Sequence, residues 1–141
     1  MKGWLLDTNI LSELRRSKPH PQVLKFIAEQ RNESLFVSVI TFAEIRFGIE
    51  RIADIQKQQA LSIWLDKELR PFFMNRVLAL DEEIILKWRI LLEQGRKQGY
   101  TYSQPDLFIA TRALHHNLGL VTRNTKDFEK VDIPLYNPWD N

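Results

Sequence analysis

The sequence predicts a single α/β domain over residues 1–141, built on a mainly parallel central sheet that helices cover. Three observations predict this class. Short apolar runs alternate with longer helical patterns, which is typical of parallel strands joined by crossover helices. The first of these runs has no internal polar residue, as expected of a strand that is buried on both faces. The chain has 141 residues, of which 44% are hydrophobic and 27% charged, so it can form one sizeable core.

The first predicted strand, residues 4–6, leads directly into Asp7, and a helix over residues 10–16 follows. We expect Thr8 or Asn9 to cap this helix, since either side chain can accept a hydrogen bond from a first-turn amide. Asp7 would then lie at the carboxyl end of a strand and before a helix. Open α/β sheets bind their ligands at such positions.

A second helix is predicted over residues 22–31, and a second strand over residues 35–39, which are rich in β-branched and aromatic side chains. Thr41 and Glu44 have the spacing of a capping box, so the third helix should begin at Thr41. A fourth helix from residue 55 should end at residue 69, before Pro71, because proline disfavours helix in the residue that precedes it. We expect the third and fourth helices to form a hairpin that projects from the sheet.

A third strand is predicted over residues 76–80, and Asp81 should cap a long helix that ends near Gly95 or Gly99. Apolar residues recur in this helix at helical spacing, and we expect them to lie in the core. They are Ile84, Ile85, Trp88, Leu91 and Leu92.

Another helix should begin at Ser103 or Gln104, with a proline in its first turn, and run to about residue 116. Three short elements complete the expected order. They are a strand over residues 120–122, a helical turn over residues 124–128 and an edge strand over residues 134–137.

Composition excludes several classes of protein. The chain has no cysteine, so it has neither a disulfide framework nor a thiolate metal site. The apolar segment before Asp7 is too short for a signal peptide, and no apolar run is long enough to span a membrane. We therefore expect a cytoplasmic protein with no membrane partner. The net charge of +2 is compatible with binding nucleic acid but is too small to predict it.

Four acidic residues occupy comparable places: Asp7 and Glu44 follow strands, Asp106 opens a helix, and Asp127 follows the fourth strand. Each could simply cap a helix. Together they should gather at one edge of the sheet, where the carboxyl ends of parallel strands meet. Two like charges about 4 Å apart cost about 4 kcal/mol at an effective dielectric of about 20, so such a cluster needs a cation or raised pKa values. Oxygen ligands favour Mg²⁺ or Mn²⁺, which points to phosphoryl chemistry.

With these motifs in view, the chain resembles the PIN-domain family, in particular the VapC and FitB-like toxins of bacterial toxin–antitoxin systems. The matching segments follow the family's order and extend over nearly the whole chain. They are residues 6–9 (Leu-Asp-Thr-Asn), 43–48, 106–110, 120–128 and 137–139 (Asn-Pro-Trp). The resemblance implies an α/β/α sandwich with metal-dependent endoribonuclease activity.

The resemblance implies that Asp7, Glu44 and Asp106 are catalytic and hold one or two Mg²⁺ or Mn²⁺ ions. Asp127 is expected to be catalytic in a supporting role, and either Asn124 or Asp127 would complete the metal site, since some relatives carry aspartate where this chain has Asn124. Further residues would position these groups. They are Thr8, Asn9, Thr122 and Asn124.

The resemblance also implies partners: an RNA substrate (often transfer RNA in this branch), a VapB-type antitoxin that occupies the active-site groove, operator DNA bound mainly through that antitoxin, and a second copy in a homodimer. Arg15, Arg46 and Arg112 are candidate phosphate contacts, and each could equally pair with an acid. The alternative is a catalytically weak PIN-like subunit that acts with its antitoxin as a DNA-binding regulator. This alternative stays open because Asn124 supplies no charge to the site. A haloacid dehalogenase-type phosphatase fits less well, because Asn9 stands where that class needs an acid.

Overall fold

A five-stranded sheet in the order β3-β2-β1-β4-β5 forms the centre of the computed structural model, which describes residues 1–140. Asn141, the last residue of the predicted domain, lies outside the described residues. The strands are β1 (Trp4–Leu6), β2 (Leu35–Ser38), β3 (Val77–Leu78), β4 (Gly119–Val121) and β5 (Leu135–Tyr136). Every pairing between neighbouring strands is parallel, so the predicted parallel sheet is confirmed.

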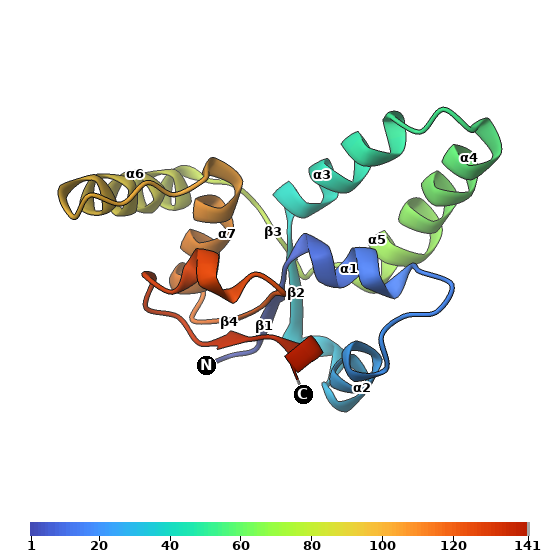
Figure 1. Ribbon diagram of the computed structural model, residues 1–141, viewed down its shortest axis with the longest axis horizontal. Coiled ribbons are helices and arrows are strands. Elements are labelled where there is room, and N and C mark those ends of the chain that lie inside the picture. The colour runs from blue at the N-terminus through green and yellow to red at the C-terminus, as the bar shows by residue number, and fades with distance from the viewer. Residues whose placement is uncertain (141) are drawn as a thin grey trace.

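Helices cover both faces of this sheet (Figure 1), which confirms the expected α/β/α sandwich. On one side lie α1 (Thr8–Leu14), α2 (Pro21–Glu29), α3 (Val39–Glu50), α4 (Ile55–Trp64) and α5 (Arg70–Phe72). On the other side α7 (Gln104–His115) packs on β4, and α6 (Glu82–Lys97) packs on α7. Short turns complete the chain: η1 (Asn32–Ser34), the π-helical η2 (Leu65–Leu69), η3 (Thr125–Phe128) and η4 (Pro138–Asp140). Within residues 1–140, no helix has both the length and the apolar character to cross a bilayer.

The alternation of side chains along β1 divides the core in two. Leu6 packs with Ile10 and Phe26 of the first helical layer, whereas Leu5 packs with Ile109 and Phe128 on the opposite face. Successive strand residues point to opposite faces, so both leucines are buried, each in its own layer. The central strand, and Asp7 at its end, are thereby held from both sides.

The structure changes two of the predicted helix starts. Asp7 itself is the N-cap of α1 and accepts a hydrogen bond from the backbone N–H of Thr8 at 2.8 Å, so the prediction of Thr8 or Asn9 as cap is wrong. In the same way, α3 begins at Val39 with Ser38 as its cap, two residues before the predicted capping box. In both places the last polar residue of the strand region is already a good cap, so the helix begins as soon as the strand ends.

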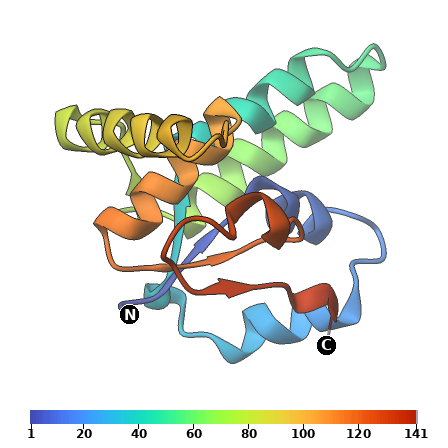
Figure 2. The ribbon, with the colours of Figure 1, turned by 60° about the vertical axis from the view of Figure 1, so that its left-hand side comes forward.

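Helical structure also passes through Pro71 instead of ending before it, so the predicted end of that helix is wrong. The π-turn η2 follows α4, and the N–H of Arg70 bonds to the carbonyl of Leu65. Pro71 then lies in the first turn of α5, where its missing N–H needs no helical partner. The other expectation for this region is confirmed: α3 and α4 pack together as a hairpin that extends from the sheet (Figures 1 and 2).

The apolar stripe predicted to be core in α6 is largely outside it. Asp81 caps this helix as expected, through a bond from the N–H of Ile84, and Ile84 is fully buried. Ile85, however, is 45% exposed, and Trp88 stacks on Phe108 of α7 with ring centroids 4.9 Å apart. Because α6 packs mainly on α7 and lies beyond the edge of the sheet (Figure 1), part of its apolar surface has no cover within the described chain.

Candidate active site

A cavity of about 470 Å³ brings three of the predicted acids together. Asp7 enters it from the end of β1, Glu44 from α3, which follows β2, and Asp106 from the first turn of α7. Asn124, from the loop after β4, also lines the cavity. These residues lie far apart in the sequence, and the parallel order of the strands places them at one edge of the sheet.

Asp7 is the most deeply placed of the three carboxylates, with 6% of its surface exposed. The Thr122 hydroxyl donates to its Oδ2 at 2.7 Å, and the backbone N–H of Thr8 donates to its Oδ1 at 2.8 Å. Burial raises the pKa of the Asp7 carboxyl, and the nearby charges of Asp106 and Glu44 add to this increase. The two hydrogen bonds oppose the increase without cancelling it.

The predicted supporting residues all contact this cluster or one another. The Thr8 hydroxyl donates to Oε1 of Glu44 at 2.9 Å. The hydroxyl oxygen of Thr122 accepts hydrogen bonds from the Asn9 amide at 3.3 Å and from the backbone N–H of Asn124 at 3.1 Å. Thr122 therefore links the loop that carries Asn124 to the carboxylate of Asp7, which fixes the orientation of that carboxylate.

The structure does not bring Asp127 into the cavity. Asp127 lies in η3 with an exposed side chain and is not among the residues that line the cavity. Its backbone N–H donates to the carbonyl of Asn124 at 3.0 Å, so it belongs to the turn that carries Asn124. The catalytic role of Asp127 stays a prediction, and the place beside the three carboxylates is taken by Asn124.

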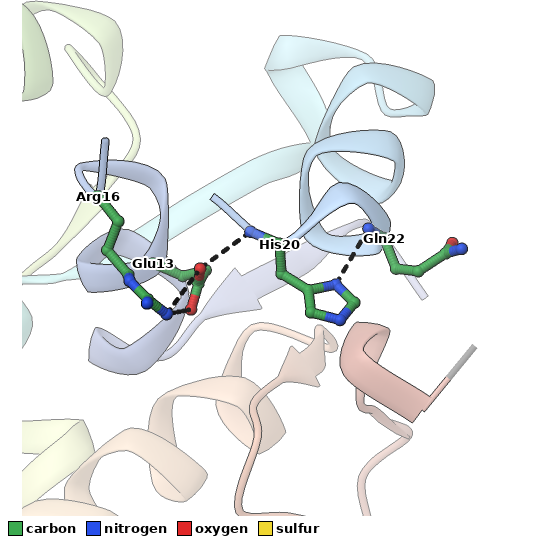
Figure 3. A network of polar contacts seen from close by, with 4 residues as sticks. All are labelled: Glu13, Arg16, His20 and Gln22. Carbon is green, nitrogen blue, oxygen red and sulfur yellow. Dashed lines mark hydrogen bonds and ion pairs between the residues drawn. The ribbon is translucent and has the colours of Figure 1, made fainter. Parts of the chain in front are cut away.

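Sequence reasoning did not single out a fourth carboxylate that lines the cavity, Glu13 of α1. It is buried, and its carboxylate accepts hydrogen bonds from the backbone N–H of His20 at 2.9 Å and from Nη1 of Arg16 at 3.2 Å (Figure 3). Burial alone would raise the pKa of the Glu13 carboxyl, but the contacts with His20 and Arg16 outweigh burial and hold it below its usual value. The spacing of four residues from Asn9, which places both on one helix face, is the signal that could have found it.

The chemistry of the lining residues fits a hard divalent cation, because carboxylate and amide oxygens are the donors that Mg²⁺ and Mn²⁺ prefer. Burial, together with the nearby charges of Asp106 and Glu44, raises the pKa of Asp7, and a cation bound beside it would favour its charged form. As the side chains lie, however, no three His, Asp or Glu residues within 1–140 are grouped closely enough to hold an ion. The exposed Glu44 is instead bonded to Thr8, so it would have to turn to join Asp7 and Asp106.

We expect Mg²⁺ or Mn²⁺ to raise the melting temperature by an amount that grows as the pH rises above 3.8, the usual pKa of an aspartate carboxyl. The pKa of Asp7 is raised on folding from 3.8, so the folded state holds this proton more tightly than the unfolded state. Its contribution to stability is complete below the unfolded pKa and is lost as the pH rises through the folded pKa. A cation that binds in place of the proton restores the lost stability. Its effect on the melting temperature therefore grows over the same pH range in which Asp7 loses its proton.

Thermal unfolding in EDTA and in each ion, across this pH range, measures the effect. Asp7→Asn is the control, because it removes the titrating group while it keeps the shape of the side chain. An ion-dependent shift that is independent of pH, or that is equally large in Asp7→Asn, would contradict the expectation.

The fold and the cavity together define a class of protein: a single α/β domain whose parallel sheet carries an acid-lined cavity at the carboxyl ends of its strands. Comparison with known families agrees with this geometry, since the PIN domain profile matches residues 4–134. The chain belongs to the PIN-domain family.

Relatives and solved structures extend the match over nearly the whole chain. Plasmid stability protein StbB of Pseudomonas syringae pv. tomato is 39% identical, covering 96% of this chain and 98% of the relative. VapC ribonuclease Y4jK of Sinorhizobium fredii is 33% identical, and toxin FitB of Neisseria gonorrhoeae is 31% identical, each covering 96% of this chain and 97% of the relative. The crystal structure of FitAcB from Neisseria gonorrhoeae superposes with a TM-score of 0.92 at 30% identity, covering 98% of this chain and 99% of that one. The resemblance seen in the sequence motifs is confirmed.

Proposed function

We propose that this protein is a divalent-metal-dependent endoribonuclease that acts as a toxin and is neutralised by a cognate antitoxin. The cavity supports this most directly, because it gathers Asp7, Glu44 and Asp106 at one edge of a PIN-domain sheet. Oxygen-only clusters of this kind suit hydrolysis of phosphodiester bonds. Two relatives have names that fit: VapC ribonuclease Y4jK, at 33% identity, is named for the activity, and toxin FitB, at 31% identity, for the role.

In this proposal, Asp7, Glu44 and Asp106 would hold Mg²⁺ or Mn²⁺, which would lower the pKa of a bound water and stabilise the negative charge that develops on the phosphate. The chain's own residues orient these ligands. Thr122 and the backbone of Thr8 bind the two oxygens of Asp7, which restricts its carboxylate to one orientation. Asn124 would supply a neutral oxygen to the same cavity.

We further propose the partners that the family suggests. A VapB-type antitoxin would occupy the active-site groove and carry most of the contact with operator DNA, in the cytoplasm. A solved neighbour at 29% identity, FitAB, is bound to a DNA fragment. A homodimer is supported by the exposed apolar side chains of α6, since a patch of neighbouring exposed apolar side chains often marks a protein–protein interface. They are Ile85, Leu86 and Ile90, at 45%, 52% and 47% exposure.

Cleavage of a labelled pool of structured RNA, transfer RNA included, by antitoxin-free protein tests the activity. Cleavage should occur with Mg²⁺ or Mn²⁺ and disappear with EDTA. The cut sites would begin to define the substrate. Absence of both cleavage and metal binding would reject the nuclease.

Asp106→Asn and Asp127→Asn form a matched pair in this assay. Asp106 lines the cavity and Asp127 does not, so we expect Asp106→Asn to lower the cleavage rate by about tenfold or more and Asp127→Asn to change it less than about threefold. Initial rates at fixed Mg²⁺ measure both. Equal losses would place Asp127 in the catalytic machinery, as the sequence alone suggested.

A second candidate is the catalytically weak subunit that works with its antitoxin as a DNA-binding regulator. Two observations favour it: the cavity has the uncharged Asn124, and its acids are not grouped tightly as they lie. Such a subunit would bind operator DNA together with antitoxin while showing no metal-dependent cleavage. The same RNA assay, run beside a DNA-binding assay of the complex, separates the two functions.

A further inference from the structure

RNA must approach a cavity that is rich in negative charge. Four carboxylates line it against two guanidinium groups, those of Arg16 and Arg123. The carboxylates are Asp7, Glu13, Glu44 and Asp106. A polyanion is repelled by such a surface unless fixed positive charge guides it, and phosphate contacts to basic side chains commonly provide most of the affinity for nucleic acid. The two arginines are therefore the groups to consider for substrate binding.

Arg16 follows the end of α1 and is held from behind by Glu13. Its Nη1 lies 3.2 Å and 3.3 Å from the two carboxylate oxygens of Glu13 (Figure 3). The Arg16 side chain is 67% exposed, whereas that of Glu13 is 5% exposed and is further fixed by the N–H of His20. A buried anchor thus restricts one edge of the guanidinium, while the remaining N–H groups face solvent at the cavity.

Arg123 is held in a different way, by the closing Asn-Pro-Trp segment. Its guanidinium carbon lies 5.1 Å from the ring centroid of Trp139, which also lines the cavity. The backbone N–H of Arg123 donates to Asn9 at 3.2 Å, and its carbonyl accepts from the Asn137 amide at 3.2 Å. Stacking on an indole leaves the N–H edge of a guanidinium free for a ligand.

The arginines that the sequence suggested as phosphate contacts are placed elsewhere. Arg112 is completely buried and donates to the carbonyls of Ala79 and Phe108. Arg46 lies 3.7 Å from Glu50 on the exposed surface of α3. Arg15 lines a neighbouring groove that includes Glu44 but neither Asp7 nor Asp106. Among these basic side chains, only Arg16 and Arg123 line the cavity of the three candidate catalytic carboxylates.

We propose that Arg16 and Arg123 form a two-arginine clamp that binds phosphate groups of the RNA backbone beside Asp7, Glu44 and Asp106. The clamp deepens the proposed function and rests on its premise that RNA binds at this cavity. The guanidinium fork matches the geometry of phosphate, and because Glu13 and Trp139 restrict the two side chains in advance, less conformational entropy is lost on binding. Phosphate contacts position a strand without reading its sequence, so the clamp sets affinity and register.

Binding of a short labelled single-stranded RNA of mixed sequence, in EDTA and over a series of salt concentrations, tests the clamp. We expect Arg16→Gln and Arg123→Gln each to weaken binding about three- to tenfold at low salt. Each should also reduce the magnitude of the slope of log Kd against log salt by about 0.7, the value for one phosphate contact on a single strand. Arg89→Gln and Lys126→Gln are the matched controls, since both remove an exposed charge outside the cavity, and they should change neither quantity appreciably.

Cleavage kinetics separate the clamp from the nuclease proposal. Arg16→Gln and Arg123→Gln should raise KM for RNA with kcat nearly unchanged, because a phosphate contact made equally in the ground and transition states affects binding only. Wild-type protein that binds RNA but does not cleave it would reject the nuclease and leave the clamp standing. If the wild-type protein cleaves RNA and neither variant alters the affinity or the slope of log Kd against log salt, the clamp alone is rejected. Failure of the wild-type chain to bind RNA at low salt, or variants that weaken only antitoxin binding, would also overturn it.

Discussion

Asp7→Asn is expected to lower the rate of metal-dependent RNA cleavage about 100- to 1,000-fold, because a bound cation supplies several kcal/mol of transition-state stabilisation and each 1.36 kcal/mol is tenfold. Asp7 is the buried carboxylate at the centre of the cluster and accepts hydrogen bonds from Thr122 and Thr8. It lies close enough to Asp106 and Glu44 for their charges to raise its pKa. Asparagine keeps the shape of the side chain but removes the charge that attracts the ion. The loss should exceed that of any other single cavity variant.

The fold should survive this substitution. Burial raises the pKa of Asp7, so removing its charge relieves a desolvation cost, and the melting temperature in EDTA should be unchanged or higher. Asp54→Asn is the matched control, since Asp54 caps α4 by accepting from the N–H groups of Gln56 and Lys57 and lies outside the cavity. Single-turnover cleavage of the RNA pool measures the effect. A loss below about tenfold with the fold intact would remove Asp7 from the chemistry.

Phe128→Ala is expected to reduce the free energy of unfolding by about 3–5 kcal/mol, the range for a fully buried phenylalanine truncated to alanine. Phe128 is 1% exposed and lies in η3, where it packs with Leu5 and Ile109 in the second core layer. A domain of this size is usually stable by about 5–15 kcal/mol, so the variant would lose a large part of its stability. Loss of the buried ring would also remove the packing contact that fixes the turn carrying Asn124.

Urea denaturation of the wild type and the variant gives this difference directly. Lys126→Ala is a suitable control, because Lys126 belongs to the same turn and is exposed, and its loss should stay within about 0.5 kcal/mol. A small effect of Phe128→Ala would mean that the turn is not anchored through its aromatic side chain.

Most of the fold could be predicted because its signals are local. The apolar run before Asp7, the run of β-branched and aromatic side chains over residues 35–39 and the start signals at Ser103 and Gln104 each indicate an element from neighbouring residues. Helix starts were less predictable. Thr41 and Glu44 form a convincing capping box, yet Ser38, three residues before Thr41, caps the helix, so Val39 and Ile40 are already helical. Where two possible N-cap residues lie within one turn of each other, the point at which strand pairing ends decides which of them begins the helix.

The same limit applies to α6. Its stripe of apolar residues indicates a helix with one buried face, which is correct for Ile84. Periodicity shows that a helix has an apolar face but not what covers it. Only α7 packs extensively on α6, so Ile85 and Ile90 stay exposed in the described chain.

The sequence by itself determined the α/β class, the parallel sheet and the three carboxylates Asp7, Glu44 and Asp106, because each acid follows a strand or opens a helix and parallel strands end at one edge. Only the tertiary structure decided that Asn124 and not Asp127 lines the cavity, and that Glu13 joins it. It also decided which arginines face the site, since Arg112 is a fully buried residue of α7 while Arg16 and Arg123 line the cavity. These outcomes depend on packing between segments far apart in the chain, which a local pattern such as the spacing of Asn9 and Glu13 can suggest but cannot decide.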